Sequence, residues 1–257
     1  MTINYIKTPN TVTVIIHDKP YQIDSKHLNY ESVLEIVTQD EMISSEALIA
    51  MMKPIEYVKE IIKINGAKFA FKDGQLTCTV EKQIITLPYN LYKEIVRVHK
   101  AGGVLTPLFN FVRKLAFNPD KRAMEELYGF ISACGLAITE SGNFLAYKAV
   151  NPDFTDRFSG KMDNSPGKAV KMLRMSVDND KHRTCSAGLH FAAWDYAKMF
   201  AGGSGKLLIL SINPKHVVAI PTDYHNQKGR ACKYKVLREV AYNEELSTKP
   251  VWSDEAD

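Results

Sequence analysis

The chain has 257 residues, of which 45% are hydrophobic and 24% charged. This is an ordinary globular composition, which excludes an intrinsically disordered chain. No apolar run approaches the ~18 residues of a membrane-spanning helix, and the N-terminus lacks the pattern of a secretory signal. We therefore expect a protein without a transmembrane segment that stays in a cytosol. Its four cysteines form no closely spaced pair, so free thiols are expected instead of disulfides or a zinc site.

The positive charge is concentrated in one part of the chain. Residues 143–240 carry 16 Lys and Arg against 8 Asp and Glu, whereas residues 1–142 carry 16 of each. Residues 241–257 hold one Lys and five acids. A basic field of this kind favours anionic partners such as nucleotides, nucleic acid or acidic membranes, although a solubilising surface has the same composition.

The first 87 residues predict a small α+β unit. Residues 11–16, TVTVII, are β-branched and alternate in polarity at their start, as a half-buried strand does. Residues 30–63 show apolar positions at helical spacing, interrupted by Pro54. Residues 68–80 alternate on both sides of Asp73-Gly74, which predicts a β-hairpin.

Residues 88–142 predict a layer of three helices. The first ends at Gly102-Gly103, and the third takes Asn118 as its N-cap, Pro119 in its first turn and Gly135 beyond its end. The aromatic residues at helical spacing in this layer predict core positions in preference to a ligand site.

From residue 143 the pattern changes to strands, at residues 143–150, 188–192, 206–212, 216–221 and 232–240. A short helix is expected at residues 193–200, and residues 151–183 predict a long polar loop of the kind that is often functional. The predicted fold class is therefore α+β. Its segments are an N-terminal α+β unit (1–87), a helical layer (88–142), a basic strand-rich module (143–240) and an acidic tail (241–257).

Signatures of common catalytic sites are missing from the chain. It has no glycine-rich phosphate loop, no HExxH motif and no GxSxG motif. Cys185 and His190 permit a nucleophile–base interpretation, but a structural Cys185 at the end of a loop, with His190 pointing into a polar pocket, is favoured. The Asp-rich run around Asp178 and Asp180 resembles part of a calcium loop, yet turn chemistry explains it better.

The run at residues 223–230 predicts an anion-contacting cluster. It places Lys228 and Arg230 on an exposed connection, close to the strand that carries Lys233 and Lys235. Without interleaved aromatic residues or a groove-binding helix, this pattern favours DNA binding only weakly.

Several blocks of the chain together resemble one known family. They are NPDKRAMEELYGF, ITESGNFLAYKAV, DNSPGKAVKM, VDND, TCSAGLH, VVAIPTDY and the spaced Lys, Arg and Tyr of residues 228–234. In this order and spacing they are similar to the rIIB family of tailed bacteriophages, over roughly residues 107–240. Unlike the T-even member, the chain begins directly with a strand and lacks the N-terminal helix-turn-helix, so a DNA-binding role of that module does not carry over.

The resemblance implies a phage accessory protein that acts in the infected bacterium. Relatives affect lysis timing and let the phage escape exclusion by a resident prophage, together with an rIIA-like partner. The expected location is the host cytoplasm or the periphery of the inner membrane, and a host defence protein is a further expected partner. The family brings no enzymatic mechanism or cofactor, so binding is favoured over catalysis.

A second resemblance concerns the segment GLHFA, which is followed by a helix and a strand. It is similar to the GIYFA-type segment of ADP-ribosyltransferases, in which Tyr147 or Lys148 and then His190 would occupy the functional positions, without a matching Glu. The alternative function is therefore a nucleotide-binding protein or an ADP-ribosyltransferase-like enzyme. In either case we expect one binding pocket, with no catalytic or metal-ligating residue assigned. Its residues are Tyr147, Lys148, Arg174, Cys185, His190, Lys228 and Arg230.

Overall fold

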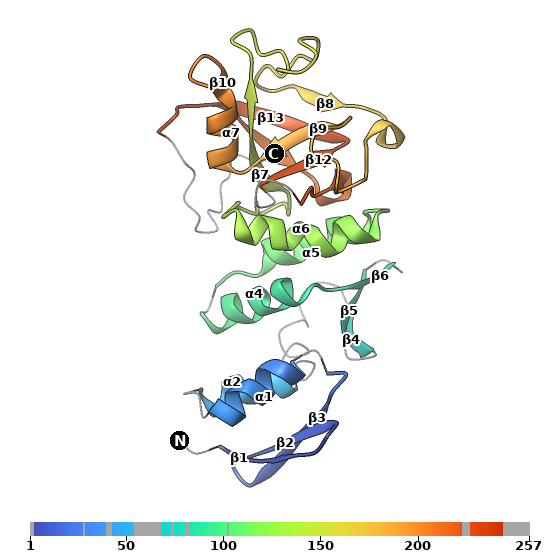
Figure 1. The fold of residues 1–257 in the computed structure, drawn as a ribbon, viewed down its shortest axis with the longest axis vertical. Helices are drawn as coiled ribbons and strands as arrows, with labels where there is room; N and C mark the ends of the chain where they lie inside the picture. Colours follow the sequence, from blue (N-terminus) through green and yellow to red (C-terminus); the bar gives the residue numbers. More distant parts are fainter. Residues whose placement is uncertain are drawn as a thin grey trace. The chain divides into compact units, whose positions relative to one another are not determined.

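The chain divides into two units in a computed structural model, Met1–Val96 and Arg97–Asp257. Figure 1 shows helices and antiparallel sheets in both units, which confirms the α+β class. The structure describes residues 3–27, 29–39, 43–53, 68–72, 75–80, 83–101, 103–222 and 227–243. The finer division into four segments stays a prediction.

The first unit begins with a three-stranded antiparallel sheet covered by two helices. The bounds are β1 Asn4–Lys7, β2 Thr11–Ile16, β3 Lys19–Asp24, α1 Tyr30–Gln39 and α2 Ser45–Met52. As the alternation predicts, Val12, Val14 and Ile16 of β2 are buried, and they form a core with Val33 of α1 and Leu48 of α2. One face of the sheet therefore supplies the core, since alternate side chains of a strand point to opposite faces.

A second small sheet confirms the predicted hairpin. Its strands, in the order β4-β5-β6, are β4 Lys68–Lys72, β5 Gln75–Val80 and β6 Gln83–Thr86. Lys72 pairs with Gln75 across the turn, while the turn residues Asp73 and Gly74 lie outside the described residues. Cys78 of β5 is fully buried, and burial raises the pKa of its thiol to about 12.

Three helices follow, as the periodicity predicts: α4 Tyr89–Lys100, α5 Thr106–Ala116 and α6 Lys121–Ala133. The N-cap of α6 is Asp120, whose carboxylate accepts a hydrogen bond from the Ala123 amide at 3.1 Å, and not Asn118 as predicted. Asn118 is only 4% exposed and donates from Nδ2 to the carbonyls of Pro214 and Val217, both at 2.9 Å. The prediction was wrong because distant backbone carbonyls, invisible in the local sequence, use the Asn118 side chain.

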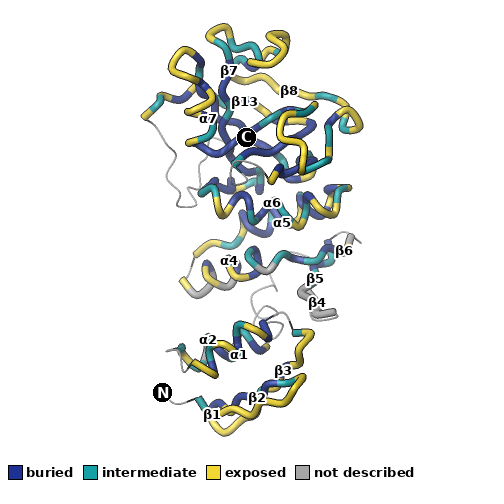
Figure 2. The backbone as a smooth tube through the Cα atoms, viewed as in Figure 1, coloured by how far each residue is buried: buried dark blue, intermediate teal, exposed yellow. Residues whose placement is uncertain are grey.

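The second unit is built on a seven-stranded antiparallel sheet in the order β11-β12-β9-β7-β10-β13-β8. Its strands are β7 Phe144–Val150, β8 Ala169–Lys171, β9 Leu189–Ala192, β10 Lys206–Ile212, β11 Val217–Ala219, β12 Lys228–Ala231 and β13 Lys233–Val240. The helix α7, Trp194–Ala201, connects β9 to β10. Figure 2 shows most of this sheet as buried.

Helices cover both faces of this sheet. On one face, Phe191 of β9 contacts Phe144 of β7 and Phe130 of α6, with ring centroids 5.5 and 5.6 Å apart. On the other face, Tyr147 of β7 packs edge-on against Trp194 of α7 at 5.0 Å. These aromatic contacts are typical of a protein core and confirm the core interpretation of Phe130.

The expected polar loop at residues 151–183 contains regular structure. It includes the edge strand β8 and a 3₁₀ turn η1, Arg174–Ser176. Asp156 orders the first part of the loop, since its carboxylate accepts from the Ser159 hydroxyl and from the amides of Ser159, Lys161 and Met162. These short-range bonds are the turn chemistry that the sequence predicted for its aspartates. No helix in the described part of the chain is long and apolar enough to cross a bilayer.

Two glycines at positive φ provide a test of the tight contact between α5 and the turn before β7. Gly142 has a φ of +82°, and a Cβ there would collide with the Asn110 carbonyl carbon and the Phe111 amide nitrogen. Gly160 has a φ of +64°, and a Cβ added there would meet no atom within 4 Å. We expect Gly160→Ala to cost about 1–2 kcal/mol of unfolding free energy, from the backbone alone. Gly142→Ala should cost about 3 kcal/mol or more, because the collision adds to that strain. Urea unfolding of both variants measures the difference, and equal losses would contradict the contact.

Candidate functional site

Lys228 and Arg230 lie in strand β12 and are 3% and 0% exposed, so the predicted exposed cluster is wrong. Arg230 donates from Nη1 to the Arg183 carbonyl and from Nη2 to the Asp180 carbonyl, both at 2.6 Å. Buried charged groups are stable only with such hydrogen bonds. Arg230 therefore fixes the loop before β9 onto the sheet, and its Nη atoms are turned to the protein's own backbone.

Four of the seven predicted residues do lie on one face of three neighbouring strands. Arg230 of β12 is directly opposite His190 of β9, and Lys228 is directly opposite Ala192. Ala192 is in turn opposite Tyr147 of β7. Because directly opposed residues of antiparallel strands share a face, Tyr147, His190, Lys228 and Arg230 form one set, which we call the β12-β9-β7 face.

The β12-β9-β7 face is covered by α7 and by the loop before β9. The Lys228 ammonium lies 3.5 Å from the Tyr196 hydroxyl of α7 and 5.5 Å from the centroid of its ring. Tyr147 is only 4% exposed, and His190 is half-buried. The result is a packed polar layer with two buried cations, which can bind or position anionic and carbonyl groups.

Lys148 lies on the opposite face of β7 from Tyr147, because neighbouring residues of a strand point to opposite sides. Its ammonium donates to the His190 carbonyl of β9 at 3.1 Å. The pairing between β7 and β9 consists of a single residue pair, Tyr147 and Ala192. The Tyr234 ring lies 5.8 Å away. Burial lowers the pKa of the Lys148 amine to about 8, against the opposing effect of the Asp156 carboxylate. Lys148 thus joins β7 to the backbone of β9 through its side chain.

Arg174 belongs to a separate cluster around Asn118. Its Nη2 donates to the Asn118 Oδ1 at 2.8 Å and to the Val217 carbonyl at 2.9 Å, and its Nη1 donates to the Lys215 carbonyl at 2.9 Å. Arg174 and Asn118 together connect η1, the start of α6 and the segment before β11. The structure therefore removes Arg174 from the predicted pocket.

Cys185 is exposed on the loop before β9. Among the described residues no hydrogen bond joins it to His190, which lies in the strand opposite Arg230. This arrangement does not support the nucleophile–base interpretation, and Cys185 does not join the β12-β9-β7 face. No group of three metal-ligating side chains occurs in the part of the chain that the structure describes.

Two polar residues of the core escaped the sequence analysis as possible site residues. Tyr234 of β13 is 2% exposed and donates its hydroxyl to Asn164 Oδ1 at 2.5 Å, and burial raises its pKa above the ordinary range. Asn164 is fully buried and also donates to the Met162 carbonyl at 2.8 Å. The two lie 70 residues apart, so no local spacing could have shown the pair.

Comparison with known proteins gives one consistent match. The family model described as Bacteriophage T4 protein rIIB matches residues 3–245. Protein rIIB of Enterobacteria phage T4 is 30% identical over 239 residues, which cover 93% of this chain and 68% of that protein. No solved structure matches the chain. The resemblance to ADP-ribosyltransferases therefore stays a prediction.

The lowered pKa of Lys148 predicts a distinct pH dependence of stability. The folded pKa is about 8 and the ordinary value 10.5, so between these values the unfolded chain binds more protons and stability rises with pH. From pH 7 to pH 9.5 we expect wild type to gain about 1–2 kcal/mol of unfolding free energy relative to Lys148→Met. Urea unfolding at both pH values measures the gain. The control variant, Lys161→Met at an exposed lysine, should show no such gain. If the difference in unfolding free energy between wild type and Lys148→Met is the same at both pH values, the lowered pKa of Lys148 is wrong.

The anchoring role of Arg230 leads to a second prediction. Arg230→Met keeps much of the side-chain volume but removes the donor of two part-buried hydrogen bonds to the Arg183 and Asp180 carbonyls, so we expect a loss of about 2–4 kcal/mol of unfolding free energy. Hydrogen exchange should accelerate in residues 178–188 above all. Arg238→Met, at a half-buried arginine of β13, is the matched control and should leave that loop unchanged. Unchanged exchange in Arg230→Met would show that the loop is held by other contacts.

Proposed function

Because this chain belongs to the bacteriophage T4 protein rIIB family, we propose that it controls lysis timing and counters host or prophage exclusion in the infected cell. The observation that carries the proposal is the family match, which extends over nearly the whole chain and not over one motif. The proposed mode of action is binding and not catalysis. The proposed place of action is the host cytoplasm or the periphery of the inner membrane.

The geometry of the second unit supports binding over catalysis. Arg230 and Arg174 are bonded to backbone carbonyls, and Lys148 is bonded to the His190 carbonyl. Cys185 has no base in hydrogen-bonding contact among the described residues. A general acid–base site needs a proton-transferring group within hydrogen-bond reach of a reacting atom, and these cations already hold the fold together. We propose an rIIA-like phage protein as the working partner, with a host defence protein as a further target.

A second candidate function is nucleotide binding on the β12-β9-β7 face. It is favoured by one observation, the common face of Tyr147, His190 and Lys228 on three neighbouring strands. These residues include the positions that resemble the functional positions of ADP-ribosyltransferases. A ligand that binds only the folded state raises apparent stability, so NAD or ADP-ribose should raise the Tm of wild type but not of His190→Ala. An unchanged Tm of wild type in both ligands removes this candidate.

The leading proposal predicts a phenotype for a phage that lacks this gene. Such a phage should lyse its host early and should not form plaques on a host that carries an excluding prophage. Supplying the chain in trans should restore both properties, and a tagged chain should co-purify with an rIIA-like protein. The variant His190→Ala, supplied in trans, should restore lysis timing and plating as well as wild type does, because the leading proposal does not require nucleotide binding. Normal lysis timing and plating of the deletion phage would overturn the proposal.

A further inference from the structure

Four exposed lysines gather where β8 pairs with β13. Lys171 of β8 lies directly opposite Lys233 of β13, and Lys235 follows two residues later, opposite Ala169. These residues share one face of the sheet. Lys215 lies in the turn before β11, next to His216. The charges of Lys215 and Lys233 both lower the pKa of His216, which connects Lys215 with the lysines of β13. We call Lys171, Lys215, Lys233 and Lys235 the lysine patch; all four are exposed.

The patch places two lysines directly opposite each other across neighbouring strands. The Met172 amide donates to the Cys232 carbonyl at 2.9 Å, so the Lys171–Lys233 pair next to it occupies a position without mutual backbone hydrogen bonds. At such positions the Cα atoms are only about 4.5 Å apart and the side chains are closest. Like charges directly opposite each other destabilise a sheet. This arrangement therefore costs stability unless an anion lies between the lysines.

Acidic side chains of the described residues do not supply that anion. Among the described residues, no carboxylate lies within ion-pair distance of a patch lysine. Acids of the same region pair elsewhere, Asp163 with Lys168 at 3.2 Å and Glu239 with Lys206 at 3.1 Å. The positive field of the patch is thus directed at solvent.

The pKa of His216, a half-buried residue, depends on the charges of the lysine patch. Burial, together with the charges of Lys215, Lys233 and Arg174, lowers the pKa of its ring to about 4. The fourth group that faces the ring is the Cys232 thiol, whose sulfur lies 3.7 Å from Nδ1. A bound anion would oppose the three cations and raise the pKa of His216.

The backbone beside the patch is open for pairing. β8 is the edge strand of the seven-stranded sheet, so the backbone groups of Ala169 and Lys171 that point away from β13 face outward. Leu173 and Met175, just beyond this strand, are 70% and 90% exposed. A lysine on an edge strand commonly prevents unwanted pairing. That explanation covers Lys171 alone, because Lys215, Lys233 and Lys235 do not lie on the edge strand.

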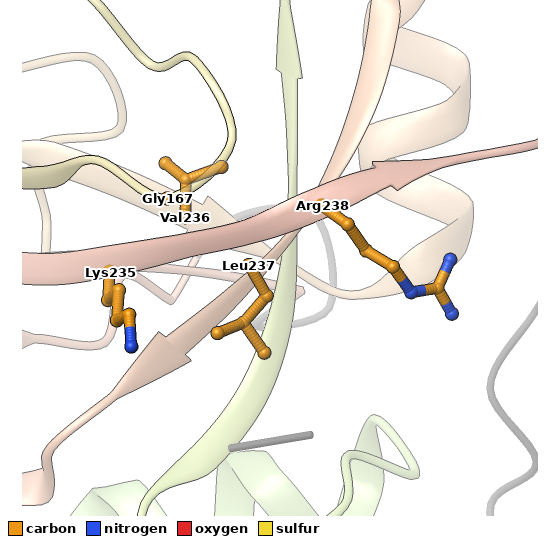
Figure 3. A pocket seen from close by; sticks show the side chains of 5 residues that line it. All are labelled: Gly167, Lys235, Val236, Leu237 and Arg238. Carbon is orange, nitrogen blue, oxygen red and sulfur yellow. The ribbon is translucent and has the colours of Figure 1, made fainter. Parts of the chain in front are cut away.

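A shallow hollow adjoins the patch. It measures about 350 Å³ and is lined by Gly167, Lys235, Val236, Leu237 and Arg238. Figure 3 shows the side chains of Lys235 and Leu237 on the same side of β13. The register of β13 against β10 shifts at this place, which leaves Leu237 without a partner in the ladder. The hollow thus offers an apolar side chain and two cations together.

We propose that the β8 edge and the lysine patch bind an extended acidic segment of a partner protein. The segment adds a strand to β8, sets its carboxylates against the lysines, and places its apolar side chains near Leu173 and Met175. A backbone, unlike a phosphodiester chain or a lipid surface, matches the outward amides and carbonyls of an edge strand. This inference rests on the proposed binding function and names the chemistry of the partner.

The test uses a fluorescein-labelled peptide of twelve residues that alternates Glu and Val. Fluorescence anisotropy measures its Kd for the full chain at low and high salt. The combined variant Lys171→Gln, Lys233→Gln, Lys235→Gln should weaken binding about tenfold or more at low salt. The control Lys121→Gln, Lys161→Gln, Lys198→Gln removes the same charge from exposed lysines elsewhere and should keep the wild-type Kd. A thermal melt of both variants confirms that each is folded.

Two further probes separate edge pairing from simple charge attraction. The same peptide with alternate backbone amides methylated on one edge should bind at least tenfold more weakly, because it cannot pair with β8. The NMR pKa of His216 should rise when the unmodified peptide binds. Equal binding of the methylated peptide, an unchanged Kd in the patch variant, or tighter binding of oligo(dT) or of phosphatidylglycerol vesicles than of the peptide would each overturn the inference. None of these results depends on the plaque assay, so failure here is distinguishable from failure of the proposed function.

Discussion

The second unit depends on a single-residue connection at Cys232. β12 ends at Ala231 and β13 begins at Lys233, yet three strands, β9, β7 and β10, lie between β12 and β13 in the order of the sheet. The sheet must therefore curl so strongly that its two halves meet at this corner. The Cys232 amide donates to the His216 carbonyl, and its carbonyl accepts from the Met172 amide, both at 2.9 Å. The corner is thus hydrogen-bonded to both halves, as donor to one and as acceptor from the other.

This corner divides one basic run between the interior and the surface. Lys228 and Arg230, before Cys232, point into the covered β12-β9-β7 face, whereas Lys233 and Lys235, after it, are exposed. The buried cations are matched by backbone carbonyls and an aromatic ring, as burial requires. The exposed cations have no such partners in the described structure. A continuous stretch of positive charge therefore serves two purposes, one in folding and one, as we propose, in binding.

The same principle explains why the predicted pocket separates into several places. Arg174, Lys148 and Arg230 each donate to backbone carbonyls of other segments of the chain. A buried carbonyl without a donor costs free energy, so such long cationic side chains stabilise the segments that they reach. Their type and charge resemble those of a binding site, although their bonds are internal. The open edge at β8 is different, because its charges and its backbone both face solvent.

The sequence by itself determined the local elements and the family of this protein. Alternation in residues 11–16, the hairpin at residues 68–80, the three helices from residue 88 and the strands from residue 143 follow from side-chain periodicity, which local backbone geometry dictates. The spaced blocks around TCSAGLH indicated the rIIB family without any coordinates. Only the tertiary structure decided which cations are buried, because the face that a strand covers depends on its register with other strands, as for Arg230 opposite His190 and Lys171 opposite Lys233. For that reason Asn118 moved from a helix cap to a core hydrogen-bonding group, Arg230 moved from the surface to the interior, and Lys171 came to lie against Lys233.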